Sequence, residues 1–334
     1  MSKIKEVYLA KNKDLNIWRS SSSGGVFNAL SKSIISKGGV VYGATYSKNN
    51  EVVHERAETE KDCIKFQGSK YVQSKMNDCF KLCKEDLLNN KYVLFTGTPC
   101  QIAGLKLFLD KIDTSRLYTQ DIICHGVPSP EFYKKYIKFM EKELESEITN
   151  VNFRSKILPN DIQDISLECK KNKIYRSYGT HDIYYNFFLR NLILRPVCYK
   201  CKFASIERVA DITLADYWGD KNKLPNNLKN ELGVSSIFIN SEKGEELWGI
   251  IKENFEYGES NLTTCMQPNL KEPSKARTNI DDLWNDYNKY DLEKLTNKYI
   301  GSYRKMKFGR NAKVALADMK ILPLYQKLKR SIKK

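Results

Sequence analysis

The stretch YVLFTGTPCQIAGLKLFL, residues 92–109, decides the fold because it joins a strand, a turn and a helix in one short run. Its apolar and aromatic start is typical of a buried strand, and a helical pattern follows the Gly-Thr-Pro turn. The stretch LYTQDIICHGVPSPEFYKKYI, residues 117–137, repeats this order. Cys100 follows the first strand, and Cys124 ends the second. If these strands are parallel neighbours joined by a helix at 101–111, both cysteines lie at the carboxyl edge of one sheet, where open α/β sheets bind ligands.

The rest of the chain continues this alternation. Further strands are predicted where short runs are apolar and β-branched, at 40–46, 211–218 and 234–240. Further helices are predicted where apolar residues recur at helical spacing, at 25–36, 76–89 and 130–144. Residues 165–179 have the pattern of a hairpin with its turn at 171–173. This order predicts an α/β fold, with a mixed, mostly parallel sheet and flanking helices.

Composition indicates a globular cytoplasmic protein. The chain has 334 residues, of which 41% are hydrophobic and 29% charged, and this balance is enough to bury a large core. Its first residues contain no apolar run of the kind found in secretory signals, and no run is long enough to cross a bilayer. The nine cysteines are therefore expected in the reducing cytosol, as metal ligands or catalytic thiols more often than as disulfides.

The positive charge is concentrated at the end of the chain. The formal net charge is +16, and residues 301–334 contain eleven Lys or Arg residues against one acid, Asp318. A basic amphipathic helix is predicted at 312–332, with a bend at Pro323. Such a tail could make peripheral contact with the inner face of the membrane, bind nucleic acid or an acidic partner, or remain a solvated basic helix.

Four cysteines form the strongest candidate metal site. Cys198 and Cys201 are three positions apart, and together with Cys100 and Cys124 they could supply four thiolates if the fold brings three loops together. Four thiolates suit zinc or an iron–sulfur cluster, and the long separations favour the cluster. Thiols without a metal are the alternative. The remaining five cysteines are expected to be structural: Cys63, Cys79, Cys83, Cys169 and Cys265.

Three segments rich in glycine and hydroxyl groups are candidates for holding a cofactor. They are SSSGGVFNAL at 21–30, QGSKYVQS at 67–74 and the Gly-Thr-Pro turn at 97–99. A helix start with glycines can hold phosphate, although an ordinary serine cap or an exposed polar strand would look the same. The candidate cofactor-binding residues are Ser23, Gly24, Gly25, Ser69, Lys70, Tyr71, Ser74, Gly97 and Thr98.

Together, these motifs resemble the coenzyme F420 hydrogenase/dehydrogenase beta subunit family. The resemblance runs from about residue 19 to 233, more weakly to 277, and rests on an ordered set of motifs: SSSGGVFNAL, GGVVYGA, GSKYVQS, FTGTPCQIAGLK, DIICHGVPSP, FR-x-K, RPVCYKCKFA and R-x-x-DITLADYWG. It implies an N-terminal module at 1–90 on the flavin side and a C-terminal module at 91–300, to which the charge pattern adds a basic tail at 301–334. It also implies FAD, and one 4Fe-4S cluster held by Cys100, Cys124, Cys198 and Cys201.

The resemblance is to the short bacterial form, which lacks a ferredoxin-like insert and is found near genes for polysaccharide biosynthesis. At most one cluster is therefore expected, and a separate protein is expected to donate or accept electrons. The implied function is an iron–sulfur flavoprotein oxidoreductase. Its acceptor would be a small molecule, either F420-like or a precursor of a surface polysaccharide, and coenzyme F420 itself is a doubtful partner.

Two residues are candidates for acid–base chemistry: His125, which follows Cys124, and Asp216 in the run LADYWG. Arg208 and Asp211 could orient a cofactor phosphate or pair with each other, and the ion pair is the favoured expectation. Two other functions use the same residues differently. One is a basic nucleic-acid-binding protein stabilised by zinc, although nucleic acid is not favoured as a partner because the charge lies in the tail. The other is a scaffold without redox chemistry in polysaccharide assembly.

Overall fold

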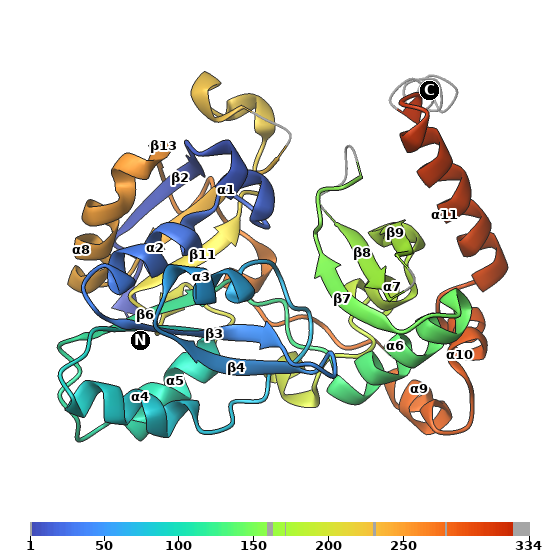
Figure 1. Ribbon diagram of the computed structural model, residues 1–334, viewed down its shortest axis with the longest axis horizontal. Helices are drawn as coiled ribbons and strands as arrows, with labels where there is room; N and C mark the ends of the chain where they lie inside the picture. The colour runs from blue at the N-terminus through green and yellow to red at the C-terminus, as the bar shows by residue number, and fades with distance from the viewer. Residues whose placement is uncertain (1, 159–162, 171, 230–231, 278, 323–334) are drawn as a thin grey trace. The chain divides into compact units, whose positions relative to one another are not determined.

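The predicted parallel strands lie side by side in a sheet of eight strands (Figure 1). The structure is a computed structural model and describes residues 2–158, 163–170, 172–229, 232–277 and 279–322. The chain divides into two compact units, each made of two segments. Unit 1 comprises Met1–Val127 and Pro196–Ser274, and unit 2 comprises Pro128–Arg195 and Lys275–Lys334.

The large sheet belongs to unit 1 and is mixed, with most strands running in one direction. Its order is β13-β2-β12-β11-β6-β5-β3-β4. The strands are β2 (Glu6–Asn12), β3 (Val40–Tyr46), β4 (Val52–Ala57), β5 (Val93–Thr96), β6 (Leu117–Ile122), β11 (Ile212–Asp216), β12 (Ser235–Ile239) and β13 (Phe255–Ser260). Strands β3, β5, β6 and β11 are parallel neighbours, and β2 runs in their direction because it is antiparallel to β12, which is antiparallel to β11.

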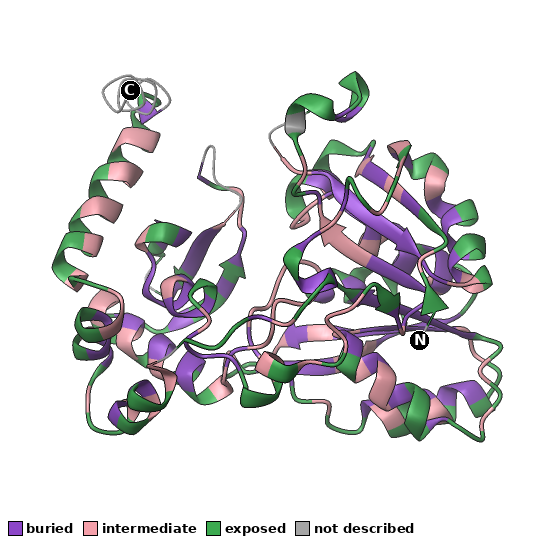
Figure 2. Ribbon diagram, turned by 180° about the vertical axis from the view of Figure 1, so that it is seen from behind, coloured by how far each residue is buried: buried purple, intermediate pink, exposed green. Residues whose placement is uncertain are grey.

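Helices cover both faces of this sheet. They are α1 (Leu15–Ser20), α2 (Val26–Ile35), α3 (Glu60–Cys63), α4 (Cys79–Leu88), α5 (Pro99–Phe108) and α8 (Glu242–Ile251). Because side chains alternate along a strand, Leu94 packs with α2 and α8, whereas Val93 and Phe95 pack with α4 and α5 on the other face. The central strands are accordingly buried, and the outer helix faces are exposed (Figure 2).

Unit 2 combines a small antiparallel sheet with helices. The sheet consists of β7 (Ile148–Phe153), β8 (Asp164–Cys169) and β9 (Ile174–Tyr178), in that order. The helices are α6 (Pro130–Leu144), α7 (Ile183–Leu189), α9 (Ile280–Tyr287), α10 (Leu292–Tyr299) and α11 (Tyr303–Asp318). Helix α11 has no buried residue, although it contacts β9 and α10 (Figure 2). Within the described ranges, no helix is long and apolar enough to span a membrane.

The predicted fold class and its strands are confirmed, with three differences. The basic helix begins at Tyr303, earlier than predicted, and the predicted bend at Pro323 lies outside the described residues. Strands β2, β4, β7 and β13 were not predicted, nor was the short pair β1 (Ser2–Lys3) and β10 (Glu207–Arg208); in β2 the alternation is broken by Lys11 and Asn12. The compact units also differ from the predicted modules, since position 90 lies inside unit 1. The predicted modules were drawn from the sequence pattern of the family and not from compactness, so their boundaries stay a prediction.

Candidate functional site

Cys100 and Cys124 lie at the same edge of the large sheet. Strands β5 and β6 are parallel, with Thr96 paired to Gln120, so both strands end on one side. Cys100 is the second residue of α5, where the Gln101 side chain accepts a hydrogen bond from the Thr98 backbone N–H at 2.9 Å. Cys124 comes just after β6, and its Sγ accepts a hydrogen bond from the Gly126 N–H at 3.4 Å.

A buried arginine ties the segment after Cys201 to the end of β6. Arg208 Nη2 forms an ion pair with Asp121 at 3.0 Å, and the side chains are 1% and 0% exposed. Arg208 also donates to the Ile122 carbonyl at 3.1 Å. On the other side it donates to the Phe203 carbonyl at 3.4 Å and to the Ser205 carbonyl at 3.2 Å. This arginine therefore fixes the chain that leaves the Cys198–Cys201 loop against the strand that leads to Cys124.

The expected pairing of Arg208 with Asp211 is wrong. Asp211 instead accepts hydrogen bonds from the Thr119 N–H and hydroxyl at 2.7 and 2.6 Å, and from the Ser241 hydroxyl at 2.7 Å. Asp211 lies just before β11 and binds the residues beside it there. Arg208 pairs with Asp121 on β6 instead. Because Asp121 is distant from Arg208 in the sequence, the spacing of residues could not predict this partner.

The four candidate cysteines act on one another electrostatically. The pKa of the Cys124 thiol is raised to about 12, mainly by burial; the Gly126 N–H lowers it, and charge repulsion from Cys100, Cys198 and Cys201 contributes to the rise. All four are at least partly accessible, whereas the other five cysteines are buried. Across the described ranges, no three Cys, His, Asp or Glu side chains are grouped tightly enough to hold a single metal ion. The thiols are thus neighbours, but they do not form the tight cage of a single-ion site.

A chain of hydrogen bonds, buried at His54 and exposed at Cys100, joins the candidate cofactor segments to that cysteine. The His54 ring lies 2.8 Å from the Ser74 hydroxyl and 3.0 Å from the Thr96 carbonyl. The Gln101 amide donates to the Ser74 hydroxyl at 2.8 Å. At the other end, the Thr98 hydroxyl lies 3.2 Å from Cys100 Sγ. These contacts connect two predicted cofactor-binding residues, Ser74 and Thr98, to a predicted metal ligand.

The direction of each hydrogen bond in this chain follows from chemistry. Burial lowers the pKa of His54 to about 4, so the ring is neutral at neutral pH. A carbonyl can only accept, so Nε2–H donates to Thr96, and the Ser74 hydroxyl donates to Nδ1. The Thr98 hydroxyl has one proton, and its oxygen lies 3.1 Å from Gln101 Oε1 and 3.2 Å from Cys100 Sγ. A thiolate can only accept, so ionisation of Cys100 would draw this proton from the Gln101 oxygen to the sulfur.

The glycine segment at the start of α2 packs against the sheet. A Cβ at Gly24 would lie 2.2 Å from the Ala10 carbonyl, and Gly24 N–H donates to the Ser235 hydroxyl at 2.8 Å. Gly25 has φ +83°, a left-handed conformation that glycine adopts without strain, and it begins the helix without a side-chain cap. The serine cap that was the simple alternative is therefore wrong, and packing already explains why Gly24 is a glycine.

The second candidate segment meets the first through a pair of serines. The Ser69 hydroxyl donates to the Ser22 hydroxyl at 3.0 Å. Lys70 Nζ donates to the carbonyls of Gln67 at 2.6 Å and Lys65 at 3.1 Å, and burial lowers its pKa to about 7. Of the residues the structure describes, none supplies a carboxylate in an ion pair with Lys70. The segment therefore presents a partly desolvated cation close to two hydroxyls.

The other predicted site residues lie around the same edge. Asp216 ends β11, and its carbonyl accepts from the Gln267 amide at 2.5 Å. The carbonyl of His125 accepts from the Ser274 hydroxyl at 2.6 Å. Ser23 lies beside Gly233, and Tyr71 is half-buried. These positions do not assign an acid–base role to His125 or Asp216, and those roles stay predictions.

Three residues of the site were not predicted: Asp121, His54 and Gln101. A sequence signal existed for two of them. An aspartate inside the apolar run LYTQDIIC must be paired if it is buried, and a glutamine three residues after Thr98 is the pattern of a capping box. His54 carried no signal, because its role depends on contacts with β5 and with Ser74.

Comparison with known proteins identifies the family. Residues 90–263, just over half of the chain, match the family model that describes the C terminus of the coenzyme F420 hydrogenase/dehydrogenase beta subunit. Among solved structures, a chain from the xenon-derivatised F420-reducing [NiFe] hydrogenase complex of Methanosarcina barkeri has a TM-score of 0.53 at 17% identity, covering 89% of this chain and 92% of that chain. No curated protein matches. The chain therefore belongs to the coenzyme F420 hydrogenase/dehydrogenase beta subunit family.

Proposed function

We propose that this member of an oxidoreductase family is an iron–sulfur flavoprotein with one 4Fe-4S cluster and one FAD. The observation that carries the proposal is the set of four thiols: Cys100, Cys124, Cys198 and Cys201 come from three separate loops, and three of them act electrostatically on the fourth. Charge repulsion from the other three makes it hard to ionise Cys124 alone, so thiolates would form together here only with a bound cation. Iron would remove that cost by binding them as thiolates.

The spacing of the thiols favours a cluster over zinc. Around one zinc ion, four sulfurs each lie about 2.3 Å from the metal and so crowd together. A 4Fe-4S cluster instead binds each thiolate at a different iron, so its ligands lie further apart. In the described part of the chain these thiols do not form a single-ion cage, which supports a group whose ligands lie further apart.

The flavin is proposed to lie along the segments at Ser23–Gly25, Ser69–Ser74 and Gly97–Thr98. Two observations support this placement. The uncapped start of α2 presents backbone N–H groups, which favour an anionic group such as the pyrophosphate of FAD. Lys70 is a cation whose hydrogen-bond partners are carbonyls, and an anion beside it would restore the favourable charged form.

The chain's own residues would hold and tune these groups. When bound, the flavin supplies two-electron hydride chemistry and the cluster supplies one-electron transfer. Arg208 holds the loop with Cys198 and Cys201 in place, and the Gly126 N–H donates to Cys124 Sγ. The Thr98 hydroxyl, which also contacts Gln101 Oε1, would donate to Cys100 once that residue is a thiolate. Such donors stabilise the more negative, reduced state, so they would raise the reduction potential.

The partners proposed are a separate protein that donates or accepts electrons and a small-molecule substrate. The similar chain from Methanosarcina barkeri belongs to a hydrogenase complex, which supports a protein partner. The substrate is proposed to be an F420-like acceptor or a precursor of a surface polysaccharide. A cytoplasmic location is consistent with reduced thiols.

The proposal is tested by removing one ligand. Cys124→Ser should abolish the paramagnetic signal that the dithionite-reduced protein shows in electron spin resonance, and should lower bound iron. The matched control is Cys265→Ser, which alters a buried cysteine outside the candidate set and should keep both. Full iron in Cys124→Ser, or an equal loss in Cys265→Ser, would contradict the assignment.

A further inference from the structure

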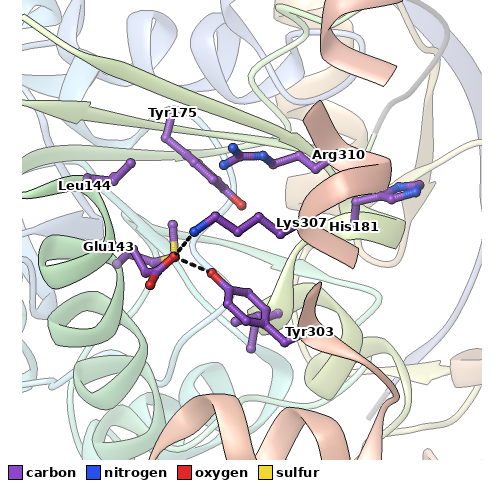
Figure 3. A pocket seen from close by; sticks show the side chains of 9 residues that line it. Glu143, Leu144, Tyr175, His181, Tyr303, Lys307 and Arg310 are labelled. Atoms are coloured by element: carbon purple, nitrogen blue, oxygen red, sulfur yellow. Dashed lines mark hydrogen bonds and ion pairs between the residues drawn. The ribbon is translucent and has the colours of Figure 1, made fainter. Parts of the chain in front are cut away.

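A cavity in unit 2 lies between β9, α6 and the basic helix α11 (Figure 3). Its volume is about 60 Å³, and its polar wall is formed by Glu143, Tyr175, His181, Tyr303, Lys307 and Arg310. One water needs about 10–15 Å³ by this measure, so the space fits a group the size of a phosphate. The cavity belongs to unit 2, whereas all four candidate cysteines belong to unit 1.

The single carboxylate of the cavity wall is already neutralised. Glu143 accepts from Lys307 Nζ at 2.6 Å and from the Tyr303 hydroxyl at 2.7 Å, and both groups point toward it in Figure 3. Burial raises the pKa of Glu143, but these hydrogen bonds outweigh burial, and its pKa lies below the usual value. Glu143 is therefore ionised at neutral pH, and its charge is matched by that of Lys307.

Arg310 adds a second cation, so the cavity wall carries two cations against one carboxylate, and both act on Glu143. Its guanidinium lies over the Tyr175 ring at 4.5 Å, and Nε donates to the neutral Asn311 side chain at 3.0 Å. In the described part of the chain, no carboxylate forms an ion pair with Arg310. The stacked ring and the amide hold the guanidinium in place, so less side-chain entropy would be lost when an anion binds.

From this charge balance and geometry, we infer that the cavity binds the phosphate group of a soluble phosphorylated small molecule. A fixed guanidinium beside a lysine ammonium matches the shape and charge of a phosphate, which can accept two parallel hydrogen bonds from arginine. The inference goes beyond the proposed redox function and does not depend on it.

Inorganic pyrophosphate is the probe, and isothermal titration calorimetry of the full chain at low ionic strength is the measurement. Arg310→Gln should weaken pyrophosphate binding about tenfold or more, since charge-assisted hydrogen bonds are lost. The matched control is Arg304→Gln, an exposed arginine of the same helix that does not line the cavity, and it should bind as the unchanged protein does. Equal affinity in Arg310→Gln, or an equal loss in both variants, would overturn the inference.

Two further measurements separate the sources of phosphate and protect the test against misfolding. Sedimentation with phosphatidylglycerol vesicles, with phosphatidylcholine vesicles as reference, reports binding to lipid headgroups. Vesicle binding without pyrophosphate binding would overturn the assignment to a soluble ligand. In the unchanged protein, pyrophosphate should protect Arg310 but not Arg304 from modification by phenylglyoxal, as read by mass spectrometry. Equal modification of Arg310 with and without pyrophosphate would overturn it too.

Discussion

The buried histidine His54 should make the stability of unit 1 depend on pH by an amount that follows from its pKa. The side chain is 2% exposed, and burial lowers its pKa from 6.5 to about 4. Between these values the unfolded chain binds a proton that the folded chain does not. The stabilisation is therefore complete above pH 6.5 and is lost as the pH falls toward 4. From the two pKa values, the loss between pH 7 and pH 5 is about 2 kcal/mol.

The perturbation is His54→Gln, which removes the titrating ring. Burial raises the pKa of Asp121 and Asp182 to about 6, and these acids change stability in the opposite direction, so only the difference between variant and unchanged protein isolates His54. The variant should be destabilised at pH 7, and this deficit should shrink by about 2 kcal/mol at pH 5.

Urea unfolding followed by tryptophan fluorescence is a suitable assay, because three of the four tryptophans lie in unit 1: Trp18, Trp218 and Trp248. The control is His181→Gln, which changes a half-exposed histidine of unit 2. Parallel pH profiles for His54→Gln and the unchanged protein would refute the reasoning. Such a result would mean that the His54 ring titrates normally and that the hydrogen-bond chain is oriented differently.

Three other substitutions test the architecture of the site. Thr98→Val removes the hydroxyl that lies beside Cys100 Sγ. The midpoint potential of the proposed cluster, measured in a spin-resonance redox titration, should fall by about 40 mV. An unchanged potential would contradict the donor role of Thr98. Arg208→Met leaves the buried Asp121 carboxylate without its counter-charge. It should lower the free energy of urea unfolding by about 3–5 kcal/mol and reduce the bound iron. Unchanged stability and unchanged iron content would contradict the anchoring role of Arg208. Gly24→Ala forces a Cβ into the backbone of β2 and should cost about 1–3 kcal/mol by thermal unfolding, whereas Gly249→Ala, with open space around it, should not.

The local parts of the fold could be predicted from the sequence because their signals are local. The two strand-to-helix corners at Cys100 and Cys124 each combine a buried strand, a turn and a helix, and the structure has them parallel and adjacent. Strand β2 lacks a clean alternation, so it was missed although it lies inside the sheet. Its place is decided by pairing with β12 and β13, which are distant in sequence.

The contacts that assemble the site could not be predicted for the same reason. Arg208 was assigned to Asp211, three residues away, but its partner Asp121 lies on a neighbouring parallel strand. The link between Ser74 and Cys100 likewise depends on how the segment at 67–74 packs beside α5. Residue type supplies the candidate side chains, whereas their hydrogen-bond and ion-pair partners are determined by tertiary packing.

The central claim is tested most directly by the metal and flavin content of the full chain purified without oxygen. We predict about four irons and four acid-labile sulfides per chain, one FAD, and a brown protein whose absorbance bleaches on reduction. One zinc per chain without iron or flavin would contradict the claim and would favour a structural zinc site on the same cysteines. A protein with neither metal nor flavin would contradict it as well.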